Sequence, residues 1–178
     1  MRTLPPAGLK PALQRVKLFL CDVDGVLTDG TVWMGDGAEL KRFDIRDGLA
    51  MKILRRNGVR VGWVSRRPSK ATRQRAEDLQ IDFLVQGDGS KPEFVEKILR
   101  RTRLNWSDVC YVGDDIVDVG VMRRVGVGVA VANAVPEARA AARYVTRAAG
   151  GHGAVRETIE LILKAQNKWD RVVAEYAG

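Results

Sequence analysis

The sequence predicts an α/β fold in which helices cover both faces of a parallel β-sheet. Three observations support this prediction. Short apolar runs alternate along the chain with longer stretches of helical spacing, as expected of strands joined by crossover helices. The runs are continuously apolar, which is typical of strands buried on both faces. One segment interrupts the alternation with two short strand-like runs around a Gly-Asp-Gly turn, and this predicts an inserted β-hairpin.

The predicted strands are the apolar runs. Val16 to Val23 ends at a glycine turn and suits the centre of the sheet. Val59 to Ser65 is the second strand. The other predicted strands are residues 83–85, 109–112 and 127–131, and a strand that begins at Val145.

Helical stretches lie between these runs. In residues 91–103, Pro92 suits the first turn and apolar residues follow at helical spacing. In residues 48–57, Gly58 predicts the end of the helix. The other predicted helices are residues 69–79, 116–125, 135–142 and 154–167. The alternation as a whole predicts a Rossmann-like sheet.

The length of 178 residues suits one domain with a substantial core, so we expect a single domain over residues 1–178. The first residues lack the apolar block of a signal peptide, and we expect them to form a loose arm. Three segments lie outside the strand–helix alternation: an N-terminal arm (1–15), the hairpin insertion (31–44), and a C-terminal tail and helix (150–178).

The hairpin insertion follows the first strand and turns at Gly35-Asp36-Gly37. It is too small to fold as a cap domain. Trp33, Met34 and Phe43 would be exposed on it, and another subunit is the simplest partner to cover them.

Composition narrows the function classes. No run approaches the roughly 20 apolar residues that span a bilayer, so we expect no membrane association. Cys21 and Cys110 lie far apart in apolar runs, which favours two buried thiols and a cytoplasmic protein over a disulfide. The single histidine argues against a zinc site.

The formal net charge of +8 comes from dispersed basic residues without an aromatic ladder. This pattern argues against nucleic acid as a partner. It leaves two interpretations open: a solvated basic surface, or a pocket that attracts a small phosphorylated, carboxylated substrate.

Polar groups follow four predicted strands, and ligands of parallel sheets bind beyond the carboxyl ends of the strands. Asp22 and Asp24 follow the first strand. Asp22 suits attack on phosphorus, and Asp24 suits protonation of the leaving oxygen and activation of water. Taken alone, the pair also fits a solvated turn. Ser65 ends the second strand, where its hydroxyl would bind a phosphoryl oxygen or cap a helix.

The other two strand ends supply opposite charges. Lys91 would offset the charge of a phosphate, although most lysines are surface residues. Asp114, Asp115 and Asp118 crowd one strand-to-helix turn, and their mutual repulsion predicts a bound cation. Oxygen ligands favour Mg²⁺, with Asp22 and Asp114 as direct ligands.

The order Asp-x-Asp, Ser, Lys and Gly-Asp-Asp-x-x-Asp, each after a predicted strand, resembles the haloacid dehalogenase superfamily. Four segments make the resemblance closer, and they look like the 3-deoxy-D-manno-octulosonate 8-phosphate phosphatase family over residues 18–169. They are DVDGVLTDG (22–30), FDIRDG (43–48), GDDIVD (113–118) and YVTRAAGGHGAVRE (144–157).

The resemblance implies a phosphatase without a cap domain that releases the free sugar acid from its phosphate monoester. It also implies a homotetramer in which hairpins meet and neighbouring subunits cover one another's active sites. The implied setting is lipopolysaccharide biosynthesis in the cytoplasm.

The resemblance also implies roles for individual residues. Asp22 would be the nucleophile that carries an aspartyl-phosphate, and it would bind Mg²⁺ together with Asp114 and the backbone carbonyl of Asp24. Asp24 would be the acid and base, while Ser65 and Lys91 hold the phosphoryl group. Asp115 and Asp118 would support the ligands. The implied substrate-binding residues are Arg46, Asp47, Gly48, Lys52, Arg67 and Arg75.

Two features qualify these expectations. Arg66 stands where the family usually has glycine, which bears on the substrate more than on the chemistry. The tail around His152 would either fold toward the mouth of the site or form a flexible turn, and we expect its histidine to face solvent.

The alternatives to this function are a phosphatase for nine-carbon acid sugar 9-phosphates, a small subunit of phenylphosphate carboxylase, and a non-enzymatic basic scaffold of the same fold.

Overall fold

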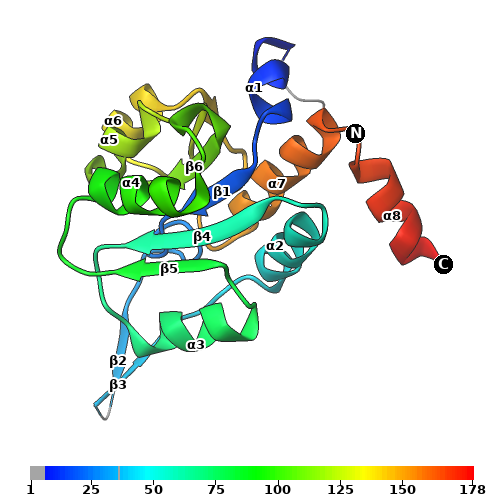
Figure 1. Cartoon of the computed structure of the whole chain (residues 1–178). Coiled ribbons are helices and arrows are strands. Elements are labelled where there is room, and N and C mark those ends of the chain that lie inside the picture. The colour runs from blue at the N-terminus through cyan, green and yellow to red at the C-terminus, as the bar shows by residue number, and fades with distance from the viewer. Residues whose placement is uncertain (1–6, 36) are drawn as a thin grey trace.

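A computed structural model describes residues 7–35 and 37–178. Its described part contains a six-stranded parallel sheet in the order β5-β4-β1-β6-β7-β8 (Figure 1). β1 lies inside the sheet and pairs with β4 on one side and β6 on the other. The strands are β1 (Leu18–Cys21), β4 (Arg60–Ser65), β5 (Phe83–Gln86), β6 (Val109–Gly113), β7 (Val127–Ala130) and β8 (Tyr144–Val145).

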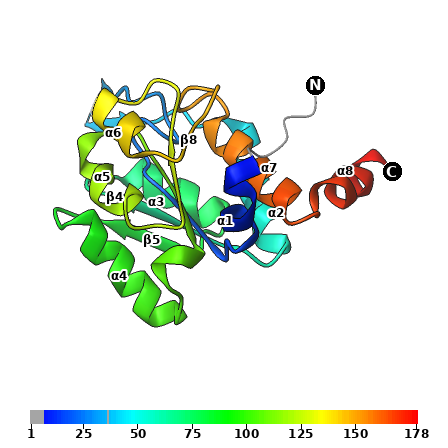
Figure 2. The ribbon, with the colours of Figure 1, turned by 90° about the horizontal axis from the view of Figure 1, so that it is seen from above.

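Helices cover both faces of this sheet (Figure 2). α2 and α7 pack together with α1 on one face, whereas α4, α5 and α6 form the other layer. The helices are α1 (Lys10–Gln14), α2 (Ile45–Arg56), α3 (Lys70–Asp78), α4 (Lys91–Thr102), α5 (Ile116–Met122), α6 (Pro136–Ala141), α7 (Ala154–Ala165) and α8 (Trp169–Ala177), with 3₁₀ turns η1 (Ala7–Leu9) and η2 (Trp106–Asp108). The predicted fold class is confirmed.

The helices depart from the predictions at the start of α2 and near both ends of the chain. α2 begins at Ile45 because Asp44 caps it, with its side chain accepting a hydrogen bond from the Arg46 N–H. Within the predicted loose arm, η1 and α1 form helical structure that buries Leu9 and Leu13. A final helix, α8, follows the predicted end of α7.

The core lies along the central strands. All four residues of β1 are buried, and Phe19, Trp63 and Tyr111 are the largest aromatic side chains with no exposure to solvent. Cys21 and Cys110 are buried free thiols, as predicted. Within the described residues, no helix is long and apolar enough to cross a membrane.

The inserted hairpin consists of β2 (Trp33–Gly35) and β3 (Ala38–Leu40), which pair antiparallel and project away from the main sheet (Figure 1). Asp36 of the predicted turn lies outside the described residues. Trp33 and Met34 are 64% and 75% exposed, in line with expectation. The predicted exposure of Phe43 is wrong: its ring is half-buried and stacks on Trp63, with the centroids 6.2 Å apart.

Candidate active site

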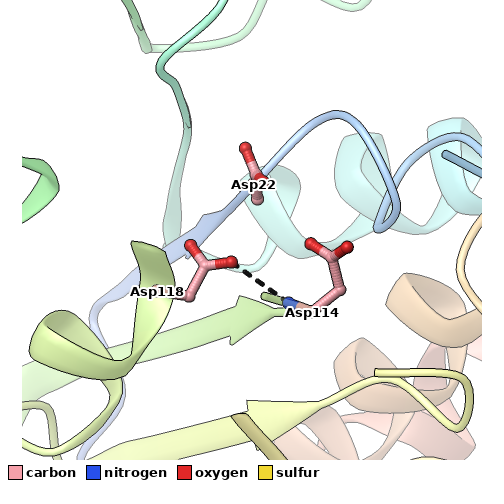
Figure 3. A group of neighbouring side chains, drawn as sticks. All are labelled: Asp22, Asp114 and Asp118. Carbon is pink, nitrogen blue, oxygen red and sulfur yellow. Dashed lines mark hydrogen bonds between the residues drawn. The ribbon is translucent and has the colours of Figure 1, made fainter. Parts of the chain in front are cut away.

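The four strand ends that carry polar groups meet at one edge of the sheet. Because β1 lies between β4 and β6, the residues that follow these strands become neighbours although they are far apart in sequence. Asp22 follows β1, Ser65 ends β4 and Asp114 follows β6. Lys91 begins α4, after β5. Figure 3 shows Asp22, Asp114 and Asp118 grouped beyond the ends of β1 and β6.

Asp22 is a buried carboxylate held at the strand end. Its backbone N–H donates to the Val112 carbonyl, which continues the pairing of β1 with β6 by one residue. Its Oδ2 lies 2.9 Å from Nζ of Lys91. Burial, opposed by Lys91 and reinforced by Asp118, raises the pKa of Asp22 to about 6. The site therefore contains a carboxylate that has few water contacts.

Lys91 is buried and lies between two carboxylates. Besides Asp22, its ammonium contacts Asp118 Oδ1 at 2.6 Å. The same oxygen accepts a hydrogen bond from the Tyr111 hydroxyl at 2.6 Å. Burial acts to lower the pKa of Lys91, but the two carboxylates outweigh it and hold the pKa above its usual value. The lysine therefore stays charged beside Asp22.

Asp118 organises the turn after β6. Its Oδ2 accepts a hydrogen bond from the backbone N–H of Asp114 at 3.1 Å (Figure 3). It also accepts one from the Asp115 N–H at 3.3 Å. Asp115 is exposed and caps α5 through the Ile116 N–H. Asp118 thus contacts both Lys91 and the Asp114 backbone.

Asp114 has the features of a cation ligand. One oxygen of each of Asp22, Asp114 and Asp118 lies within 4.8 Å of the others. Asp114 Oδ1 is buried and has no hydrogen-bond partner in the described part of the chain. Burial and the charges of Asp22 and Asp118 raise the pKa of Asp114 to about 8. A divalent cation between Asp22 and Asp114 would satisfy the orphaned oxygen and relieve the repulsion, so these residues fit Mg²⁺.

Gly25 makes room for this arrangement. Its φ of +87° lies in the left-handed region, which favours glycine. A Cβ at this position would lie 2.0 Å from Asp114 Oδ2. The glycine of the Asp-x-Asp-Gly motif therefore permits Asp114 to approach the Asp22 loop.

Asp24 has partners that the sequence did not indicate. Its Oδ1 lies 2.6 Å from Nζ of Lys41, which follows β3 of the hairpin. Lys41 also lies 3.5 Å from Glu39, and Glu39 accepts a hydrogen bond from Ser69 Oγ at 2.7 Å. Sequence reasoning missed Lys41 and Glu39. The available signal was their alternation with apolar Leu40, which places both on one face of the hairpin.

Ser65 is buried at the end of β4. Its hydroxyl oxygen accepts a hydrogen bond from the Arg67 N–H at 3.0 Å, so the side chain stabilises the turn that follows the strand. Ser69, and not Ser65, caps α3 by accepting from the Thr72 N–H. Any contact of Ser65 with phosphate remains a prediction.

The six predicted substrate-binding residues fall into separate groups. Asp47 and Gly48 lie near the start of α2, and a Cβ on Gly48 would lie 2.7 Å from a guanidinium nitrogen of Arg75. Arg46 is exposed and pairs with Asp44, whereas Arg67 pairs with Glu39. Lys52 lies further along α2. In the described part of the chain, none of the six is hydrogen-bonded or ion-paired with Asp22, Lys91, Asp114 or Asp118.

Asp47 is a buried carboxylate near this group. It accepts a hydrogen bond from the Arg156 N–H at 2.6 Å, which links α2 to α7. Its other oxygen has no partner among the described residues. Burial raises the pKa of Asp47 to about 6.

Arg66, at the position where the resemblance led us to expect glycine, is exposed. It has no ion pair or side-chain hydrogen bond within the described residues. With Asp88, Ser90 and Lys91 it lines an open cavity of about 370 Å³ at the carboxyl edge of the sheet. A free guanidinium therefore stands beside the lysine of the site.

The glycine-rich tail packs against the Asp22 loop. A Cβ on Gly150 would lie 1.7 Å from the Gly25 carbonyl oxygen, and the Gly151 N–H donates to the Val26 carbonyl at 2.9 Å. His152 is exposed as expected, with its ring 3.3 Å from Arg42. The tail therefore packs toward the mouth of the site, which is the first of the two arrangements that the sequence allowed.

Comparison with known proteins agrees with the geometry. Residues 83–157 match the family of haloacid dehalogenase-like hydrolases. The 3-deoxy-D-manno-octulosonate 8-phosphate phosphatase KdsC of Yersinia pestis is 43% identical over 154 residues, covering 86% of this chain and 82% of that protein.

Solved structures show the same fold. A probable YrbI family phosphatase from Pseudomonas syringae pv. phaseolica 1448a has a TM-score of 0.94 at 41% identity, covering 97% of this chain and 99% of that one. The 3-deoxy-D-manno-octulosonate 8-phosphate phosphatase of Moraxella catarrhalis, in complex with magnesium, phosphate and KDO, has a TM-score of 0.93 at 35% identity, covering 95% of this chain and 98% of that one. This chain therefore belongs to the haloacid dehalogenase-like hydrolases, in the 3-deoxy-D-manno-octulosonate 8-phosphate phosphatase family, and is a phosphoric monoester hydrolase.

Proposed function

We propose that the protein is a magnesium-dependent phosphatase that converts 3-deoxy-D-manno-octulosonate 8-phosphate to the free sugar acid and phosphate. The observation that carries the proposal is the grouping of Asp22, Lys91 and Asp114 at the carboxyl edge of the sheet. The Moraxella catarrhalis relative, with magnesium, phosphate and KDO, supports the same metal and product.

In the proposed mechanism, a carboxylate oxygen of Asp22 attacks phosphorus. A bond from Asp22 to phosphorus forms, and the bond from phosphorus to the sugar oxygen breaks. Asp24 gives its proton to the departing sugar oxygen, so the sugar leaves as an alcohol. Asp24 then takes a proton from a water molecule, which attacks the aspartyl-phosphate and releases inorganic phosphate and the Asp22 carboxylate.

The surrounding residues balance the charges. Lys91 lies between Asp22 and Asp118 and would offset the charge of the phosphoryl group. Ser65 would bind a phosphoryl oxygen by turning its hydroxyl from the Arg67 carbonyl. Mg²⁺, held by Asp22, Asp114 and the Asp24 carbonyl, would supply shielding of the nucleophile and polarisation of the phosphoryl group.

Recognition of the sugar acid would use the second set of residues. Guanidinium groups bind carboxylates through two parallel hydrogen bonds, which suits Arg46, Arg67 and Arg75. Asp47, Gly48 and Lys52 would complete the pocket.

We propose a homotetramer as the assembly, because exposed Trp33 and Met34 on the hairpin need a partner. The setting we propose is the cytoplasm, in lipopolysaccharide biosynthesis.

The test is a substrate panel with purified protein. Phosphorylated eight- and nine-carbon sugar acids and phenylphosphate are each assayed for phosphate release, with Mg²⁺ and after chelation. We expect the highest kcat/KM for the eight-carbon acid and loss of turnover on chelation. No hydrolysis of any monoester with Mg²⁺ present would refute the phosphatase. A preference for the nine-carbon acid or for phenylphosphate would reassign the substrate.

A further inference from the structure

The hairpin that projects from the domain also reaches into the active site. Its apolar residues Trp33, Met34 and Leu40 face solvent. Two charged residues, Glu39 on β3 and Lys41 just after it, contact residues of the site instead. Glu39 and Lys41 are two positions apart, so an extended chain directs both side chains to the same face.

Lys41 is the more buried of the two. Its side chain has 0% exposure, and its ammonium lies 2.6 Å from Asp24 Oδ1 and 3.5 Å from Glu39 Oε1. A buried ammonium is costly unless it is paired, so these two carboxylates are what make its position tolerable. Lys41 is therefore held at Asp24 and is not a mobile surface lysine.

Glu39 fixes the other side of this contact. Its Oε1 accepts from Ser69 Oγ at 2.7 Å, and its Oε2 pairs with Arg67 at 2.5 Å. Ser69 is the N-terminal cap of α3, and Arg67 lies in the turn after β4. The hairpin is thus tied to the domain, and Lys41 is placed by a network with its own supports.

The two oxygens of Asp24 are in different situations. Oδ1 is bound to Lys41, whereas Oδ2 is buried and has no hydrogen-bond partner in the described part of the chain. A buried carboxylate oxygen without a partner is costly, and such atoms are common at sites that bind a ligand or perform chemistry. The Lys41 contact fixes which oxygen stays unpaired.

We propose that Lys41 is a positioning residue for Asp24: it holds Oδ1, so that Oδ2 exchanges the proton with the sugar oxygen and then with water. This inference rests on the proposed function, because it gives the acid and base of that reaction its orientation. It assigns the hairpin a part in catalysis besides any role in assembly. No bond is made or broken at Lys41 itself.

The kinetic test uses leaving groups of different basicity. A sugar alkoxide needs a proton to leave, whereas p-nitrophenolate leaves without one. In Lys41→Met we expect the rate of phosphorylation by the sugar phosphate to fall about a hundredfold or more, the scale of general acid catalysis. The p-nitrophenol burst from p-nitrophenyl phosphate should slow less than about tenfold, and KM should change little.

Companion variants separate positioning from folding. Lys41→Arg keeps the cation and should recover part of the sugar phosphate rate, while Glu39→Gln should give a smaller loss of the same kind. Lys17→Met is the matched control: Lys17 pairs with Asp108 at 3.4 Å at the opposite end of β1, and this variant should keep wild-type kinetics. Equal losses with both leaving groups, or no loss in Lys41→Met, would overturn the proposal.

A structural measurement tests positioning without activity. Crystal structures of wild type, Lys41→Met and Lys17→Met should show the Asp24 carboxylate rotated or split in Lys41→Met alone. An unchanged Asp24 in Lys41→Met would overturn the inference even if the enzyme is the proposed phosphatase. A wild type that hydrolyses no monoester would refute the proposed function, while the crystal structures would still decide whether Lys41 orients Asp24.

Discussion

The two edges of the parallel sheet treat charge differently. At the carboxyl edge, Lys91 and Asp118 form an ion pair that is almost completely buried. At the amino edge, Lys17 pairs with Asp108 across 3.4 Å; the Asp108 carboxylate is buried, but the lysine side chain is 63% exposed. Lys17 and Asp108 lie where the chain enters β1 and β6, whereas Lys91 and Asp118 lie on helices that follow β5 and β6. Of the two pairs, only the one at the carboxyl edge buries its ammonium group.

This difference indicates where function resides. An ion pair whose ammonium group is exposed to solvent adds little to stability and costs little. A buried pair has a desolvation penalty that can exceed its attraction, so well-packed apolar residues would serve stability as well or better. The carboxyl edge nevertheless keeps Asp22, Lys91, Asp114 and Asp118 together, which indicates that the charges serve chemistry.

The largest expected effect is at Asp22, the proposed nucleophile. Asp22→Asn keeps the size of the side chain and removes the carboxylate that we propose attacks phosphorus, so phosphate release should fall by at least about a thousandfold. Circular dichroism and thermal unfolding should show a folded protein. Activity within tenfold of wild type would contradict the covalent role of Asp22.

Loss of the buried pair should affect stability. Asp118→Ala leaves the Lys91 ammonium, the Tyr111 hydroxyl and two backbone N–H groups without their common acceptor, and we expect the free energy of unfolding to fall by about 3 kcal/mol. Lys17→Met at the amino edge should cost less than about 1 kcal/mol. Denaturant unfolding measures both, and similar losses at the two edges would contradict the comparison.

Buried charge at the carboxyl edge should also make stability depend on pH. Burial raises the pKa of Asp47 to about 6 in the folded protein. The contribution of Asp47 to the free energy of unfolding is therefore greatest at low pH and is lost as pH rises through 6. Asp47→Asn avoids this loss and keeps an acceptor for the Arg156 N–H. We expect the variant to match wild type near pH 4 and to exceed it by about 1–2 kcal/mol at pH 8.

The control for this prediction is Glu77→Gln on α3, where the carboxylate is exposed. Its unfolding free energy relative to wild type should not change with pH. A constant difference between Asp47→Asn and wild type from pH 4 to pH 8 would show that burial of Asp47 carries no charge penalty.

The smallest expected effect concerns Arg66. Arg66→Gly removes an exposed cation from the cavity beside Lys91, so KM for a phosphorylated sugar acid should rise about two- to fivefold, with the increase shrinking at high salt. Arg123→Gly, at the C-terminal end of α5 and so at the amino edge, is the control and should leave KM unchanged. A lower KM in Arg66→Gly would mean that Arg66 obstructs the site.

Several features were predictable because their signals are local. The continuous apolar run before Asp22 is the composition of a strand buried on both faces, and β1 is such a strand. The Asp-x-Asp-Gly and Gly-Asp-Asp motifs mark turns at strand ends, and the order of the strands brings those ends together. Gly25 shows why the motif includes glycine, since a side chain there would collide with Asp114.

Other features depend on contacts between distant segments. The solvent exposure predicted for Phe43 was wrong because Trp63, twenty residues further along, provides a stacking surface that the pattern around Phe43 does not reveal. The partners of Asp24 could not be predicted either. The Glu-Leu-Lys pattern of the hairpin shows that Glu39 and Lys41 lie on the same face, but it does not show which residues of the domain that face contacts.

The sequence by itself determined the fold class, the family and the class of reaction, hydrolysis of a phosphoric monoester, because each depends on short patterns of residues. Only the tertiary structure decided which charged groups of the site contact one another. Lys91 lies between Asp22 and Asp118, Asp114 keeps an unpaired oxygen, and Lys41 reaches Asp24 from the hairpin. These arrangements require the packing of the whole chain, since the energy of a buried charge depends on every group around it.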